Sequence, residues 1–149
     1  MKHTTRDDFE SWLVDMDDAL ERFVDALPQE VAQRLDFTPG SLDALEEWIL
    51  DRYESTDQML VASEAATVDG LARYVGETFR KVIGGRWGIH LDDPKYVFYG
   101  LPEIIDYSDK TTSLCPISLA TASADRRSGK YLSGVLASYV RDSERQRAG

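Results

Sequence analysis

Five residues in the middle of this chain have types and spacings that could support chemistry. They are Tyr74, Glu77, Arg80, Trp87 and Tyr99. Glu77 and Arg80 are three residues apart, so on a helix they share one face. In a functional interpretation, Glu77 accepts a proton or binds a cation inside a pocket, as in a small ligand-binding domain or an enzyme. In a structural interpretation, Glu77 bonds only Arg80 or backbone amides, which is the commoner role of a single carboxylate beside an arginine.

Other reactive residues give weaker patterns. His90, Asp92 and Asp93 could ligate a divalent metal, but Asp-Asp-Pro is an ordinary turn sequence, and strand alternation would separate Asp93 from the other two. Cys115 precedes an expected helix start and has no positioned histidine partner, which predicts a buried and unreactive thiol. We therefore predict no catalytic residue, no metal site and no cofactor.

The same region resembles a group of small bacterial proteins of unknown function, some of them actinobacterial. The resemblance rests on the runs 74–80 (Tyr-Val-Gly-Glu-Thr-Phe-Arg) and 84–87 (Gly-Gly-Arg-Trp), and on a later Cys115-Pro116 helix start. It covers roughly residues 70–140. Relatives in this group are thought to act as immunity or accessory proteins near toxin genes, so the resemblance implies a protein partner. The shared pattern carries no active site.

Charge is distributed unevenly along the 149 residues. The chain has 27 acidic and 17 basic residues, which gives a net charge of −10. Residues 1–57 contain 16 acidic and 5 basic residues, whereas residues 58–149 contain 11 and 12. The acidic surplus therefore lies entirely in the amino-terminal segment. Such a balance argues against non-specific binding to nucleic acid or to an anionic membrane, because both need a surplus of Lys and Arg.

The acidic segment has two main interpretations. Its helices either solvate their outer faces with Asp and Glu, or dock a basic partner protein such as a toxin or a nucleic-acid-binding protein. In the second case, the expected binding residues are Asp15, Asp18, Asp25, Glu46, Glu47 and Asp51. A third interpretation is a homodimer formed through the first helix or through an exposed aromatic strand.

Apolar residues at helical spacing predict the elements that position these acids. The stripe over 9–27 predicts one helix with an acidic outer face. Proline at 28 ends it and begins a short helix over 28–35. Ser41 is the expected N-cap of a third helix over 41–54, in which Glu46 faces water.

The helical period continues beyond residue 57 and changes to an alternating one after the glycines at 84 and 85. In order, we expect a helix at about 57–82, strands at 87–91, 96–99 and 103–107, and helices at 116–124 and 131–140, with fraying beyond 143. The strand at 96–99 rests on its aromatic and β-branched composition. The small residues of the 57–82 helix predict close packing and a central position.

Together these elements predict a single α+β domain over residues 1–149. It has a helical amino-terminal half, a small antiparallel sheet of two or three strands, and two carboxy-terminal helices. The lone cysteine and the absence of a long apolar stretch predict a cytoplasmic protein without membrane association. The expected function is that of a non-enzymatic interaction module, with a ligand-binding pocket or a homodimer as alternatives.

Overall fold

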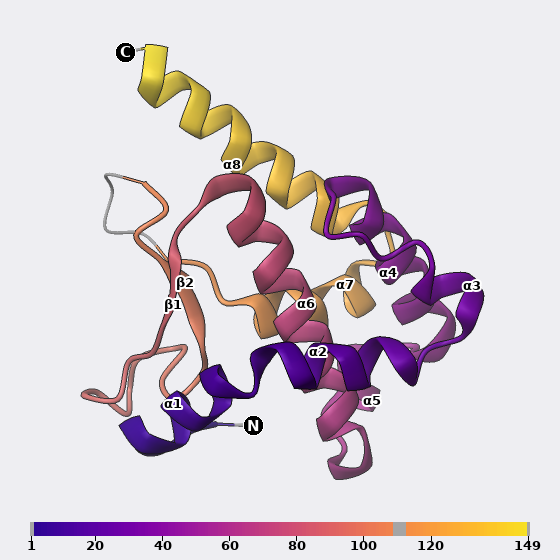
Figure 1. Cartoon of the computed structure of the whole chain (residues 1–149), viewed down its shortest axis with the longest axis horizontal. Coiled ribbons are helices and arrows are strands. Elements are labelled where there is room, and N and C mark those ends of the chain that lie inside the picture. The colour runs from indigo at the N-terminus through magenta and orange to yellow at the C-terminus, as the bar shows by residue number, and fades with distance from the viewer. Residues whose placement is uncertain (1, 109–112, 149) are drawn as a thin grey trace.

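The computed structural model describes residues 2–108 and 113–148, and its elements surround one central helix (Figure 1). In chain order they are α1 (Arg6–Val14), α2 (Met16–Asp25), α3 (Gln29–Ala32), α4 (Pro39–Arg52), α5 (Thr56–Met59), the 3-10 turn η1 (Ala62–Glu64), α6 (Ala65–Ile83), β1 (Arg86–Gly88), β2 (Glu103–Ile105), α7 (Pro116–Arg126) and α8 (Tyr131–Ala148). The central helix is α6, which contacts α2, α4, α7 and α8. Its buried side chains, among them Leu71, Tyr74 and Phe79, occupy the middle of the core.

The chain is an α+β domain, as the sequence predicts. Its amino-terminal half is helical, two helices close the carboxy-terminal end, and a two-stranded antiparallel sheet lies between them. Figure 1 shows the sheet to one side of α6, with α2 crossing near the base of α6 and α8 extending away from the body. Among the helices of the described residues, none is both long and apolar enough to cross a membrane.

The first expected helix is divided in two at Asp15. The prediction of one helix over 9–27 is wrong, because Asp15 adopts φ −81° and ψ 2° between α1 and α2. Trp12 and Met16, on either side of this break, both belong to the buried core. The break therefore changes the direction of the chain while the two short helices each keep an apolar face inside.

The helix α4 starts before the predicted cap. Thr38 is the N-cap, because its Oγ1 accepts a hydrogen bond from the amide of Ser41, and Pro39 takes the first helical position that suits proline. Ser41 is buried within the helix, and its hydroxyl is hydrogen-bonded to the Tyr74 hydroxyl at 2.7 Å. The prediction that Ser41 caps the helix is therefore wrong: its polar group bonds the central helix instead.

The expected helix over 57–82 is broken near its start. Only α5, η1 and then α6 from Ala65 form, because Val61 is extended, with φ −72° and ψ 147°. The close packing expected of its small residues is confirmed at Gly70, where an added Cβ would overlap the Phe23 ring, but it is wrong for Ala62, Ala65 and Ala66, which are exposed. Gly84 ends α6 with a φ of +81°, which a glycine adopts without strain.

The sheet has two strands, the smaller of the two numbers predicted. β1 and β2 pair in antiparallel register, with Trp87 opposite Ile104, and Leu114 adds an isolated bridge to Ile104. The predicted strand at 96–99 is wrong, because these residues form consecutive turns in which amides bond the carbonyl three residues earlier, as from Tyr99 to Tyr96. The strand edge through which a homodimer was expected is therefore missing from this segment.

The two carboxy-terminal helices form as predicted, but the last one is longer. α7 starts at Pro116, and α8 continues to Ala148, beyond the end expected at about residue 140. Between them, Arg127 adopts a left-handed φ of 55°. Its guanidinium donates hydrogen bonds to the carbonyls of Leu50 and Tyr53, so it caps the end of α4.

Candidate functional site

Three of the five residues of the predicted pocket lie together. One Glu77 oxygen accepts a hydrogen bond from the Trp87 indole nitrogen at 3.0 Å, and both accept from Arg80 Nη1 at 3.0 Å. Gly76 allows this contact, since the Trp87 ring lies directly against its backbone. The arrangement attaches β1 to α6, and each bond of Glu77 is made to a neighbouring side chain rather than to backbone.

A recess of about 470 Å³ opens beside these three residues. Its walls also include Leu13, Val14, Met16, Asp17 and Arg86. Arg86 is itself paired with Asp106 at 2.7 Å. Glu77 accepts hydrogen bonds on both oxygens, so its negative charge is already paired with Arg80 inside the protein.

The other two predicted pocket residues lie elsewhere. Tyr74 is fully buried on another side of α6, where its hydroxyl accepts from the Phe37 amide at 2.9 Å and its ring stacks on Phe37. Burial raises the pKa of Tyr74, despite its bond to Ser41. Tyr99 belongs to the turns before Gly100 and is not part of the Glu77 recess. The structure thus keeps Glu77, Arg80 and Trp87 together and separates the two tyrosines from them.

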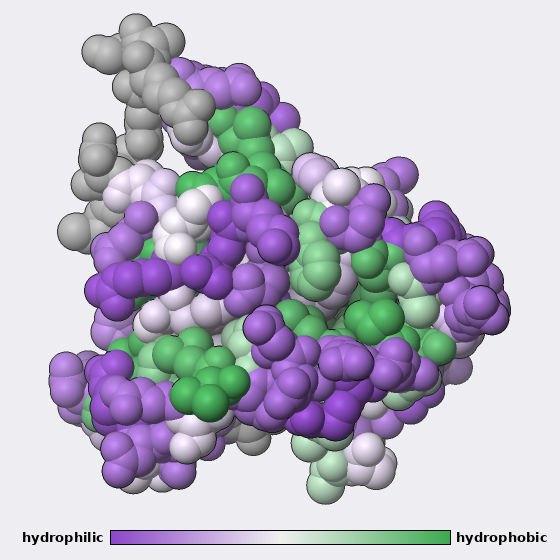
Figure 2. Space-filling view, viewed as in Figure 1, coloured by the Kyte–Doolittle hydropathy of each residue, from purple (hydrophilic) through white to green (hydrophobic). Residues whose placement is uncertain are grey.

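Two of the predicted acidic residues, Asp15 and Asp18, line a second recess, of about 430 Å³. Its other lining residues are Asp7, Glu10, Ser11 and Val14, and we call this surface the acidic recess. Val14 is 88% exposed. Asp15 pairs with Arg22 at 2.7 Å across the surface. Figure 2 shows purple side chains over α2 and a green patch among purple ones over α1.

Glu46, another predicted binding residue, is buried rather than exposed. Its carboxylate accepts hydrogen bonds from the amides of Tyr131 at 3.1 Å and Leu132 at 2.8 Å, so it caps the start of α8. A carboxylate at this position also interacts favourably with the helix dipole. Beside it, Asp43 accepts from Lys130 and Ser133. The prediction that Glu46 faces water is therefore wrong, because α8 covers that face of α4.

The remaining predicted acids are exposed but lie outside the acidic recess. Asp25 is at the end of α2, while Glu47 and Asp51 are on α4. Glu47 approaches Arg34 at 3.7 Å, and both side chains are largely exposed. The six predicted acids therefore do not form one surface: two line a recess, one caps a helix, and three are exposed at other places on α2 and α4.

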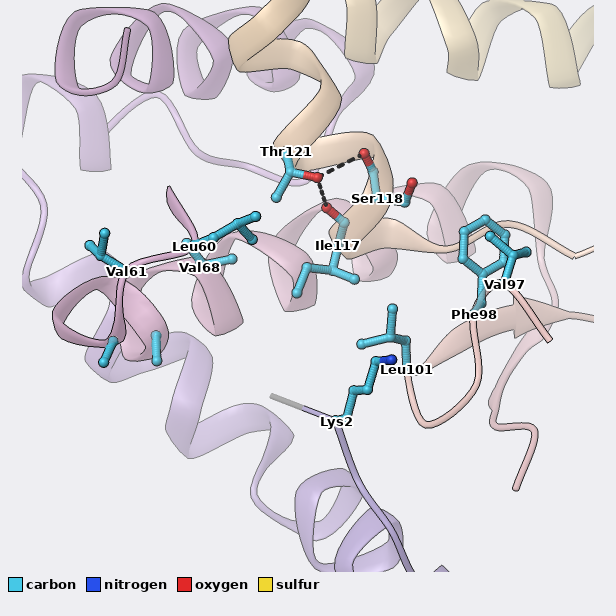
Figure 3. A pocket seen from close by; sticks show the side chains of 12 residues that line it. Lys2, Leu60, Val61, Val68, Val97, Phe98, Leu101, Ile117, Ser118 and Thr121 are labelled. Atoms are coloured by element: carbon cyan, nitrogen blue, oxygen red, sulfur yellow. Dashed lines mark hydrogen bonds between the residues drawn. The ribbon is translucent and has the colours of Figure 1, made fainter. Parts of the chain in front are cut away.

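Sequence reasoning missed a further recess, an apolar groove of about 670 Å³. It is lined by Lys2, Leu60, Val61, Ala62, Ala65, Val68, Val97, Phe98, Leu101, Ile117, Ser118 and Thr121. In Figure 3, side chains from α7, from the Leu60–Val68 segment and from the 97–101 turns converge on this space. No spacing along the sequence indicates this groove, because its lining residues come from separate segments of the chain. We call this site the apolar groove.

His90, considered in the sequence as a possible metal ligand, belongs to a hydrogen-bonded cluster around Glu103. Nδ1 of His90 is 2.6 Å from one oxygen of the buried Glu103, whose other oxygen accepts from Tyr96 and Ser113 at 2.7 Å each. These bonds attach the 94–100 turns to β2. Across the part of the chain that is described, no three His, Cys, Asp or Glu residues gather in a way that could hold a metal ion.

Cys115 is buried at the start of α7. Burial raises the pKa of its thiol to about 11, and its Sγ lies 3.8 Å from the Pro102 carbonyl. The thiol is therefore protonated at neutral pH, and the prediction of an unreactive cysteine agrees with this environment.

Comparisons of the chain with protein-family models, with curated proteins and with solved structures return no match. We therefore infer its function from the geometry of its own residues.

Proposed function

We propose that the protein is a non-enzymatic interaction module that binds a basic partner protein through the acidic recess on α1 and α2. The observation that carries the proposal is Val14, a large apolar side chain that is 88% exposed inside a recess whose lining includes Asp7, Glu10, Asp15 and Asp18. An apolar side chain surrounded by one sign of charge suits a partner that presents an apolar residue among Lys or Arg.

The charge balance of α1 and α2 supports the same partner. From Arg6 to Asp25 the chain has eight acidic and two basic residues. One of the two, Arg22, is paired with Asp15. The resulting negative potential would speed encounter with a basic surface, and salt would weaken this effect. It also opposes the approach of nucleic acid.

The resemblance to immunity-type bacterial proteins suggests the class of partner, a basic toxin or toxin-like protein. A cytoplasmic location is consistent with the free, buried Cys115, because a reducing compartment keeps such a thiol intact. This proposal replaces the broader acidic face expected from the sequence with a smaller surface that omits Glu46.

The test compares three purified forms of the full chain as baits in a native lysate. They are the wild type, the recess variant Asp7→Lys/Glu10→Lys/Asp18→Lys, and the matched control Glu30→Lys/Glu47→Lys/Asp51→Lys, which changes the net charge equally outside the recess. We expect the wild type and the control to capture the same basic protein and the recess variant to lose it.

Affinity for the captured protein is then measured between 50 and 300 mM salt. We expect it to fall by about tenfold or more over this range, because electrostatic attraction between exposed charges is screened. Equal capture by the recess variant and the control, or an affinity that does not depend on salt, would disprove the proposal.

A further inference from the structure

The apolar groove is lined by most of the large hydrophobic side chains that are exposed in the described part of the chain. Among the described residues, five large hydrophobic side chains are exposed, and three of them line this groove: Leu60 at 66%, Val61 at 49% and Val97 at 74%. Clustered apolar exposure of this kind marks a binding site more often than isolated exposed residues do. A ligand that covered these side chains would remove apolar surface from water, which is favourable.

The groove contains few polar groups, and two of them have no partner. Thr121 donates its hydroxyl to the Ile117 carbonyl at 3.0 Å and is satisfied within α7. Within the described chain, neither the Lys2 amine nor the Ser118 hydroxyl makes a hydrogen bond or an ion pair. Figure 3 shows Lys2 opposite Ser118 and Thr121, with Leu101 and Ile117 between them. The groove therefore offers an apolar surface with one free cation at its side.

We propose that the apolar groove binds an aliphatic carboxylate, whose alkyl chain lies against Leu60, Leu101 and Ile117 and whose carboxylate pairs with Lys2. A volume of about 670 Å³ lies within the range of small-molecule sites, which are mostly apolar with a few orienting polar groups. Among the lining residues that the structure describes, Lys2 is the one with a charge, so it selects for an anionic head group.

This ligand differs in charge from the partner proposed for the acidic recess. The recess attracts cations, whereas the charged residue among the described lining of the groove, Lys2, is positive. The net charge of −10 opposes an anion in general, but salt at 0.15 M screens exposed charges beyond about 8 Å, so Lys2 dominates locally. The two sites are therefore independent, and either proposal can fail alone.

Calorimetric titration of the full chain with hexanoate, octanoate and decanoate at 0.15 M salt tests the apolar contact. We expect the affinity to rise by up to about fourfold per added methylene, which is the value of burying one CH₂ group. Octylammonium, which has the same chain but a positive head, is expected to bind several-fold more weakly than octanoate. An affinity that is independent of chain length would overturn the proposal.

Two variants locate the site. Ala65 is an exposed residue of the lining, so Ala65→Trp fills the groove without changing the core, and we expect octanoate affinity to fall at least tenfold. The matched control is Ala137→Trp, on the exposed surface of α8 and outside the groove lining, which should bind as the wild type does. Equal binding by the two variants would show that the ligand lies elsewhere.

A third variant tests the head group. Lys2→Met removes the lysine cation at the groove, and we expect octanoate affinity to fall about fivefold while octanol affinity is unchanged, since an exposed ion pair contributes modestly. If Lys2→Met leaves octanoate affinity unchanged, the role of Lys2 is disproved. If analytical ultracentrifugation instead shows a wild-type dimer that Ala65→Trp dissociates, the groove is a surface between two copies of the chain and the proposal is overturned.

Discussion

In the acidic recess, Asp7, Glu10 and Asp18 face solvent around Val14, whereas at the junction of α4 and α8 the carboxylates of Asp43 and Glu46 bond groups of the protein itself. Both regions belong to the same acidic half of the chain. In one, negative charge remains available to a partner. In the other, it fixes where a helix begins. The net charge of a sequence segment therefore overestimates the charge that is available to a partner. A carboxylate that accepts hydrogen bonds from the protein's own groups stabilises the fold instead.

The largest loss of stability is expected when an internal charge, that of Arg73, is removed. This side chain is 3% exposed and donates to Asp69 at 2.7 Å and to the Trp12 carbonyl at 2.8 Å, while Asp69 also accepts from the Trp12 indole. We expect Arg73→Met to lower the free energy of unfolding by about 3–5 kcal/mol, because it leaves a partly buried carboxylate without its cation. Urea denaturation measures the loss.

The matched control for Arg73 is Arg22→Met. Arg22 pairs with Asp15 at the same distance, 2.7 Å, but at the surface, so its removal should change the free energy of unfolding far less. Similar losses in the two variants would contradict the distinction between internal and exposed charge.

A smaller effect is expected at Glu46. Glu46→Ala removes the acceptor for the amides of Tyr131 and Leu132, and we expect the free energy of unfolding to fall by about 2–3 kcal/mol. Glu47→Ala changes the adjacent exposed acid and should stay within about 0.5 kcal/mol of the wild type. Thermal and urea denaturation of both variants compare the two positions directly, and equal effects would refute the helix-capping role.

The smallest effect concerns Asp43 and depends on pH. Burial alone would raise the pKa of Asp43, but hydrogen bonds from Lys130 and Ser133 outweigh it and hold the pKa below its usual value. A lowered pKa in the folded state gives stability that is complete above the unfolded pKa of about 4 and is lost as the pH falls through the folded pKa.

Asp43→Asn should therefore destabilise the protein by about 1 kcal/mol at pH 7, and this difference should shrink as the pH falls below about 4. Asp18→Asn in the acidic recess should leave stability at pH 7 nearly unchanged, or raise it slightly by relieving repulsion between like charges. Denaturation curves at pH 3 and pH 7 check both statements. A gap between Asp43→Asn and the wild type that widens at low pH would contradict the assignment.

The sequence predicted much of the fold because helical periodicity is a local signal. The apolar stripes of α2, α6 and α8 repeat every three or four residues, and the glycines after α6 mark its end correctly. The run 96–99 shows where the same logic fails. Its aromatic composition suits a strand, but Tyr96 instead reaches Glu103 from a series of turns. Composition favours a strand only when a neighbouring strand is present to pair with it.

The candidate sites were harder to predict. Glu77, Arg80 and Trp87 were found because two of them share a helical turn and the third follows the helix directly. The apolar groove was not found, because its lining comes from four separate segments, at residues 2, 60–68, 97–101 and 117–121. No spacing between residues along the sequence indicates that these distant segments lie together in the fold.

By itself, the sequence determined the α+β class, the central helix, the acidic amino-terminal segment and the pairing of Glu77 with Arg80. These features depend on residue types and on spacings within one or two helical turns. Only the tertiary structure decided that Glu46 is internal, that Val14 is exposed among acids, and that Leu60, Val97 and Ile117 face one groove. The physical reason is that exposure depends on which element covers a face, and that element can lie 85 residues away, as Tyr131 does from Glu46.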